Sequence, residues 1–137
     1  MSDKIAIAAV DGLLSYAQLD VASRSVATAL LEGQADLDEA RVAYFIPPSA
    51  AHVAVQRGIW RAGGVTVPLA LSHPPPELEY VIRDADARTV VAAREHLPLL
   101  APIVAAAGAR LIAADEALTA APLTDLPHLG SPRRAMP

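Results

Sequence analysis

The chain has 137 residues, a formal net charge of −4 and a sequence pI of about 5.4. This balance excludes the basic surface of a typical nucleic-acid-binding protein. The chain is 53% hydrophobic and lacks cysteine, which predicts a packed core and excludes disulfides, thiolate zinc sites and thiol catalysis. No apolar run reaches the roughly 18 residues of a membrane span, and the N-terminus does not resemble a secretory signal. The absence of cysteine fits a cytoplasmic location.

Strands and helices alternate along most of the chain. In order, the sequence predicts strands over residues 5–10 and 13–14, a helix from Ser15 to Gly33, a strand over 41–46, a helix over 50–62, a strand over 65–67, a helix starting at 74–76, a strand over 88–92, a helix over 97–107, a strand over 110–113 and a short helical turn capped by Asp115. Such alternation is typical of an α/β fold with a layered, mostly parallel sheet and crossover helices.

Local signals place the ends of these elements. Asp11-Gly12 is a pair favoured in tight hairpin turns. Ser15 and Gln18 have the spacing of a capping box, and Ser49 can cap the next helix. After residue 120 prolines recur without periodicity, so we expect a folded unit over residues 1–120 and an extended tail or linker over residues 121–137.

The sequence contains few candidates for chemistry. Gly63-Gly64 follows a helix, whereas phosphate binding needs glycine before one, so these glycines are interpreted as a helix stop. The histidines are scattered without a metal-binding pair, and the most interesting, in a Ser-His-Pro loop, is interpreted as a solvated or locally hydrogen-bonded residue. They are His52, His73, His96 and His128.

Three further clusters have simple structural interpretations. Trp60 between Arg57 and Arg61 could form a stacking platform, but packing under a helix end with two snorkelling arginines is favoured. Residues Asp84 and Asp86 are better explained by capping and solvation than by paired acid–base catalysis. The arginine pair Arg133-Arg134 is too short for a nucleic-acid-binding patch.

Four segments resemble, in order, the opening of acyl-CoA synthetases and other adenylate-forming enzymes. They are LSYAQL (14–19), RVA (41–43), IWRAGGVTVPL (59–69) and ELEYVIRDADARTVV (77–91). The family counterparts read TYAEL, RVA, RAGAVAVPL and ELEYILEDSGAKVVV. Within the family, WRAGG (60–64) and SHP (72–74) most resemble enzymes similar to malonyl-CoA synthetase or to fatty-acid-CoA ligase. The resemblance implies the N-terminal subdomain of the acyl-CoA synthetase fold and a place in fatty acid metabolism.

The resemblance also implies carboxylate activation in a parent enzyme. There, ATP and a carboxylic acid give an acyl-adenylate, and the CoA thiol then displaces AMP, with Mg²⁺ stabilising the phosphoryl charge. The family's phosphate loop, acidic metal ligand, ribose-binding aspartate and C-terminal lysine have no counterpart in this sequence. No catalytic, cofactor-binding or metal-binding residue is therefore assigned, and ATP, Mg²⁺ and CoA are expected only for the full-length parent.

Three functional hypotheses follow. The chain is a catalytically inactive N-terminal part of an acyl-CoA synthetase, a stand-alone α/β protein-interaction module, or one half of a split ligase. In each case an unpartnered chain should expose apolar faces that drive association. The expected partners are the remainder of the synthetase or a second chain, which predicts a homo-oligomer or poor solubility rather than a monomer, with no nucleic acid and no membrane span.

Overall fold

The computed structural model describes the backbone of residues 5–9 and 12–120 and the side chains of residues 15–120. Its main feature is a four-stranded sheet in which every pair of neighbours is parallel, in the order β4-β3-β5-β6. The strands are β3 (Arg41–Phe45), β4 (Val65–Pro68), β5 (Thr89–Ala92) and β6 (Arg110–Ala113). The predicted α/β class is confirmed, because each connection between consecutive strands of this sheet contains a helix. The predicted tail over residues 121–137 lies outside the described residues.

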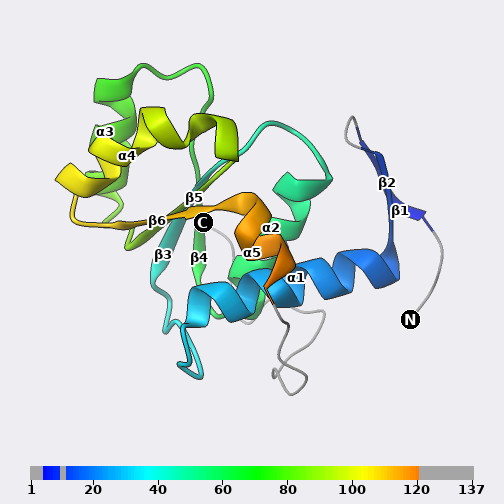
Figure 1. The fold of residues 1–137 in the computed structure, drawn as a ribbon. Coiled ribbons are helices and arrows are strands. Elements are labelled where there is room, and N and C mark those ends of the chain that lie inside the picture. Colours follow the sequence, from blue (N-terminus) through cyan, green and yellow to red (C-terminus); the bar gives the residue numbers. More distant parts are fainter. Residues whose placement is uncertain (1–4, 10–11, 121–137) are drawn as a thin grey trace.

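Helices cover both faces of the sheet (Figure 1). One layer holds α1 (Tyr16–Leu31), α2 (Ala50–Arg61) and α5 (Ala114–Thr119), and the other holds α3 (Pro75–Asp84) and α4 (Leu97–Ala106). Strand β3 is buried on both sides, since successive side chains of a strand point to opposite faces. Val42 and Tyr44 belong to the core cluster under the first layer, whereas Ala43 and Phe45 belong to the cluster under the second.

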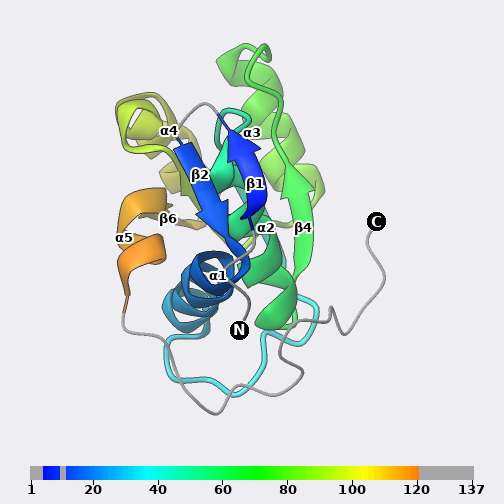
Figure 2. The same ribbon diagram turned by 90° about the vertical axis from the view of Figure 1, so that its right-hand side faces the viewer.

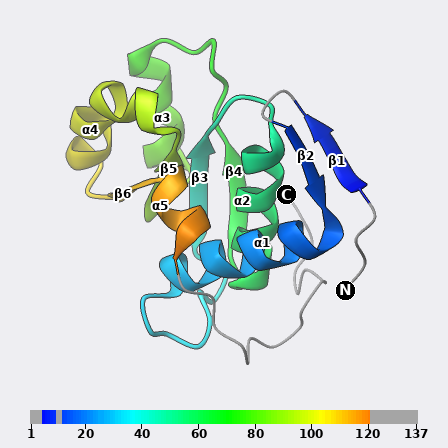
Figure 3. The ribbon, with the colours of Figure 1, turned by 45° about the vertical axis from the view of Figure 1, so that its right-hand side comes forward.

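An antiparallel hairpin precedes the sheet. Its strands are β1 (Ile5–Ala9) and β2 (Gly12–Ser15), and Gly12 pairs with Ala9 as the first residue of β2. The hairpin is confirmed, although Gly12 belongs to a strand and Asp11 lies outside the described residues. The hairpin contacts α1 and α2. It faces the viewer in Figure 2, and Figure 3 shows it on the side away from α3 and α4.

The predicted helix starts are confirmed in atomic detail. The Gln18 backbone N–H donates to Ser15 Oγ over 3.1 Å, and the Ser15 N–H donates to Gln18 Oε1 over 2.9 Å, which completes the capping box. At α2, the His52 N–H donates to Ser49 Oγ over 3.1 Å. Helix α3 starts with Pro75 in its first turn, where the missing N–H would have had no helical partner.

Three helices end in the same hydrogen-bonded turn. After α2, the Gly63 N–H donates to Trp60 O over 3.0 Å and the Gly64 N–H donates to Ile59 O over 2.9 Å. Gly63 has φ +87°, a left-handed conformation that glycine adopts without strain. Helices α3 and α4 end with the same bond pattern around Asp86 and Gly108. The chain therefore turns directly from each helix into the following strand.

Two details differ from the sequence predictions, a short 3-10 helix and the role of Asp115. The short 3-10 helix η1 (Arg94–His96) was not predicted. Helix α4 agrees with the helix predicted over 97–107, and it continues through Pro102 with Leu100, Ile103 and Val104 packed against the sheet. Asp115 does not cap α5. The N-cap is Ala113, and Asp115 lies in the first turn, where its carboxylate accepts a hydrogen bond from Arg94. In the described part of the chain, no helix combines the length and apolarity that crossing a bilayer requires.

Candidate functional site

The strand order places a topological switch point between β3 and β5. The chain leaves β3 toward β4 on one side of the sheet and leaves β5 toward β6 on the other side. In open α/β sheets, ligands bind outside the carboxyl ends of the two strands at such a point. The candidate site therefore lies between the loop over residues 46–49, which follows β3, and the loop over residues 93–96, which follows β5.

Hydrogen bonds hold these two loops at the end of the sheet. The Ala93 N–H donates to Phe45 O over 3.2 Å, so the loop after β5 stays joined to the end of β3. On the other side, the Ser49 hydroxyl donates to Pro47 O over 2.8 Å and accepts from the first turn of α2. The site is therefore framed by backbone that is well anchored on both sides.

Histidines from three elements lie at this end of the sheet. His52 contacts Tyr44 and His96 contacts Phe45, each with ring centroids 5.0 Å apart in an edge-on arrangement. Because Tyr44 and Phe45 point to opposite faces of β3, the two imidazoles lie on opposite sides of the sheet. Burial lowers the pKa of His52 and raises the pKa of Tyr44.

The third histidine, His73, follows β4, and its partners among the described residues are local. Its backbone N–H donates to Ala70 O over 3.1 Å, and its Nε2 lies 3.6 Å from a carboxylate oxygen of Glu77. The backbone of His73 is thus bonded locally, whereas Nδ1 of its imidazole has no hydrogen-bond partner among the described residues. Among the described residues, no three His, Asp or Glu side chains lie close enough together to hold a metal ion. His128 lies outside those residues.

An ion-pair cluster joins the carboxyl ends of β5 and β6. Arg94 Nε donates to Asp115 Oδ2 over 2.7 Å, and its Nη2 donates to Asp115 Oδ1 over 3.1 Å and to Glu116 Oε1 over 3.0 Å. The hydrogen bonds from Arg94 lower the pKa of Asp115 and raise the pKa of Arg94 itself. The cluster is exposed, so its contribution to stability is small. Its effect is to occupy the guanidinium of Arg94, which follows β5, with carboxylates.

The interpretation of Arg61 as a snorkelling side chain is wrong. Arg61 is only 6% exposed, and its Nη2 forms an ion pair with Asp20 of α1. Arg24, one turn along α1, lies 3.6 Å from the same carboxylate. Trp60 and Arg57 are half-buried, as packing at a helix end predicts. Arg61 therefore joins α1 to α2. The local sequence does not reveal this contact, because Asp20 is 41 positions away.

The remaining candidates have structural roles. Gly63 and Gly64 stop α2, as predicted. A Cβ on Gly64 would lie 3.0 Å from Ile59 Cγ2 and 3.1 Å from Ala40 O, so the position is also tightly packed. Asp84 is exposed at the end of α3, and Asp86 has φ +53° in the turn that follows. Capping and solvation thus account for both aspartates. The arginines at residues 133–134 lie outside the described residues.

Comparison with known proteins identifies the family. The sequence profile of the AMP-binding enzyme family matches residues 1–131. The chain is 36% identical over 122 residues to a malonate–CoA ligase of Arabidopsis thaliana, covering 79% of this chain and 20% of that protein. It is 43% identical over 77 residues to the human mitochondrial malonate–CoA ligase, covering 56% of this chain and 13% of that protein.

The fold agrees with this assignment. The crystal structure of apo MatB from Rhodopseudomonas palustris superposes with a TM-score of 0.74 and 29% identity, over 87% of this chain and 26% of that chain. The chain thus spans about a fifth or less of the length of these two curated relatives and matches the N-terminal part of the ligases. It belongs to the AMP-binding enzyme family and has the fold of the N-terminal part of an acyl-CoA synthetase.

Proposed function

We propose that this chain is the N-terminal scaffold of an ATP-dependent ligase that joins a carboxylic acid to CoA, and that it is not catalytic alone. The observation that carries the proposal is the match of nearly the whole chain to one end of such ligases. The names of the curated relatives support malonate or a similarly short carboxylic acid as the substrate of the parent enzyme.

The chemistry of the switch point supports an inactive scaffold. Adenylate formation needs cationic donors for the phosphates and oxygen ligands for Mg²⁺. In the part of the chain that the structure describes, Arg94 donates to Asp115 and Glu116, and no group of three metal-ligating side chains converges. These residues do not fit ATP or its metal ion, so we assign the binding of ATP, Mg²⁺ and CoA to other parts of the parent ligase.

Acid-dependent ATP–pyrophosphate exchange tests this proposal directly. The 137-residue chain is purified alone and assayed with ATP, Mg²⁺, labelled pyrophosphate and a panel of short mono- and dicarboxylic acids. Full-length MatB serves as the positive control under identical conditions. We expect no exchange above the enzyme-free blank with any acid. Exchange that depends on both the chain and an acid would overturn the assignment of an inactive scaffold.

One structural observation favours a second candidate, a protein-interaction module. The outer side of β6 pairs with no strand among the described residues, so the sheet offers an edge to another chain. The DNA sequence past codon 137 separates the candidates. An in-frame continuation that encodes a Gly/Ser/Thr-rich loop ending in Pro-Lys-Gly supports the ligase scaffold. A stop codon followed by unrelated sequence supports the module or a split ligase.

A further inference from the structure

The two edges of the parallel sheet differ in how they are protected. Among the described residues, β4 and β6 each have a neighbouring strand on one side only. An edge strand presents backbone N–H and C=O groups that can pair with another chain, and proteins commonly block such edges with proline, charge or cover.

Strand β4 carries such a block. The Val65 N–H donates to Ala40 O and the Leu69 N–H donates to Tyr44 O, each over 3.0 Å, so odd-numbered residues of this segment face β3. Because successive N–H groups of a strand point to alternate sides, Thr66 and Pro68 face outward. Pro68 has no N–H, so this edge lacks a donor at one of its two outward positions.

Strand β6 carries no such block. The Arg110 N–H donates to Arg88 O over 3.0 Å, so Arg110 and Ile112 direct their backbone groups toward β5. Leu111 and Ala113 therefore direct both N–H and C=O outward. The strand has the sequence Arg-Leu-Ile-Ala, with no proline and with its charge only at the first position. Its edge is thus chemically ready for strand addition.

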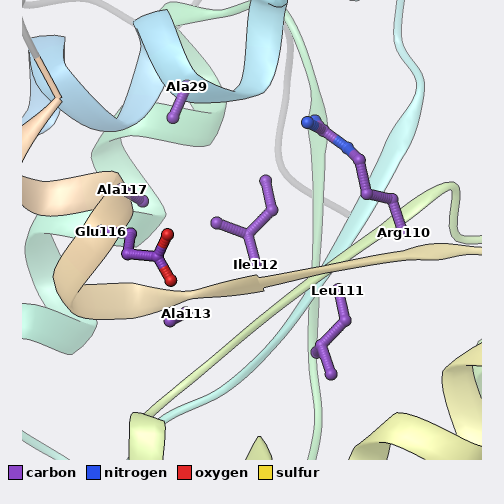
Figure 4. Close-up of a pocket in the computed structure, with 7 residues that line it drawn as sticks. All are labelled: Ala29, Arg110, Leu111, Ile112, Ala113, Glu116 and Ala117. Carbon is purple, nitrogen blue, oxygen red and sulfur yellow. The ribbon is translucent and has the colours of Figure 1, made fainter.

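A shallow groove runs along this edge. It has a volume of about 360 Å³ and lies between β6, α1 and α5. Figure 4 shows Arg110 at one end and Glu116 at the other, with Ile112 between them. The two charged side chains remain 35% and 69% exposed despite their ion pairs within the chain, to Glu32 and Arg94. The groove therefore has opposite charges at its two ends and an apolar centre.

We propose that β6 pairs antiparallel with β6 of a second copy of this chain, which joins the two sheets across a two-fold axis. A two-fold interface brings the same surface from each copy together, so opposite ends of the groove meet. The outward groups set the register. Leu111 of one copy pairs with Ala113 of the other, and Ile112 meets its own counterpart on the axis, where side chains lie closest in a non-hydrogen-bonded pair.

The charges of the groove agree with this register. With Ile112 on the axis, Arg110 lies opposite Ala114 of the second copy, at the start of the helix that carries Glu116. Each arginine thereby approaches the acidic end of the other groove, and the arrangement occurs twice by symmetry. Such complementarity favours the antiparallel pairing, because a parallel one would place like charges together.

Sedimentation equilibrium of the 137-residue chain over a wide concentration range tests the proposal. We expect a monomer–dimer equilibrium for the unmodified chain. Leu111→Pro removes an outward N–H that no described strand uses, and should raise the dimer dissociation constant at least about tenfold. Leu111→Ala shortens the same side chain but keeps the N–H, and should leave the dissociation constant nearly unchanged. A chain that stays monomeric at every concentration, or variants that dimerise equally, would overturn the proposal.

Charge exchange provides a test that does not depend on proline. Arg110→Glu and Glu116→Arg should each weaken the dimer, and the double variant should recover much of the loss because the opposite charges meet again across the axis. Glu77→Arg, on the helix layer over the other face, is the matched control and should have no effect. Absence of recovery in the double variant would contradict the register. These measurements need no ATP or acid, so their outcome is independent of the proposed ligase function.

Discussion

Gly58 provides a sharp test of how α1 and α2 pack. A Cβ added at this position would lie 2.4 Å from Val26 Cβ, 2.5 Å from Val26 Cγ1 and 2.9 Å from Ser23 O. Intrinsic helix propensity alone predicts that Gly58→Ala stabilises α2 by about 1 kcal/mol. The packing predicts the opposite, because Val26 Cβ and the backbone oxygen of Ser23 cannot rotate away from the new methyl group.

The net effect can be estimated from these two terms. Overpacking a well-filled core costs about 1–3 kcal/mol, and a contact this short belongs at the upper end. After the gain in propensity, we expect Gly58→Ala to lower the free energy of unfolding by about 2 kcal/mol. This corresponds to a fall in Tm of roughly 8 °C for a chain of this size. Urea denaturation followed by far-UV circular dichroism measures the change.

Second-site variants identify the contact responsible. Val26→Gly removes both the Cβ and the Cγ1 that meet the new methyl group, so it should cost less in the Gly58→Ala background than alone. Val26→Ala keeps the Cβ at 2.4 Å and should rescue much less. Arg57→Ala, the adjacent half-buried position, is the control and should change stability by no more than about 0.5 kcal/mol. A Gly58→Ala variant as stable as the unmodified chain would refute the reasoning.

Two further predictions concern the buried charge of Arg61 and the half-buried imidazole of His52. Asp20→Asn should lower the free energy of unfolding by about 2–4 kcal/mol, because the buried Arg61 loses its anionic partner; thermal melts measure this, and an unchanged Tm would contradict it. Burial lowers the pKa of His52 below its ordinary value of 6.5, so the unfolded chain binds this proton more readily than the folded chain. The destabilisation is absent above pH 6.5 and grows as the pH falls toward the lower folded pKa. Unfolding free energies measured from pH 7.5 to pH 5.5 should therefore fall more steeply for the unmodified chain than for His52→Gln, and parallel curves would disprove this role.

Most helix ends of this protein were predictable because they depend on near neighbours. Ser15 and Gln18 are three residues apart, and Ser49 caps through a backbone group three residues away. The left-handed turn at Gly63 likewise uses bonds that span only a few residues. Such interactions form from local sequence whatever the rest of the fold does, so sequence patterns report them reliably.

The ion pairs were not predictable for the opposite reason. Arg61 meets Asp20 across 41 positions, and Arg94 meets Asp115 across 21. Arg61 therefore resembled a snorkelling surface residue, and Asp115 resembled a helix cap. Nothing in the local sequence distinguishes these side chains from solvated ones, because their partners arrive only when separate helices and strands pack together.

The candidate site likewise combines features that the sequence predicts with features that only the tertiary structure shows. The order of strands and helices along the chain, and the resemblance to the N-terminal part of acyl-CoA synthetases, could be established from sequence alone. Only the tertiary structure places β3 between β4 and β5, and this order creates the switch point. It also gathers at one end of the sheet histidines that looked scattered, and no described strand pairs with the outward groups of Leu111 and Ala113. Sequence determines local conformation through short-range hydrogen bonds and hydrophobic periodicity, whereas strand order and long-range charge pairing depend on how the whole chain buries its apolar surface.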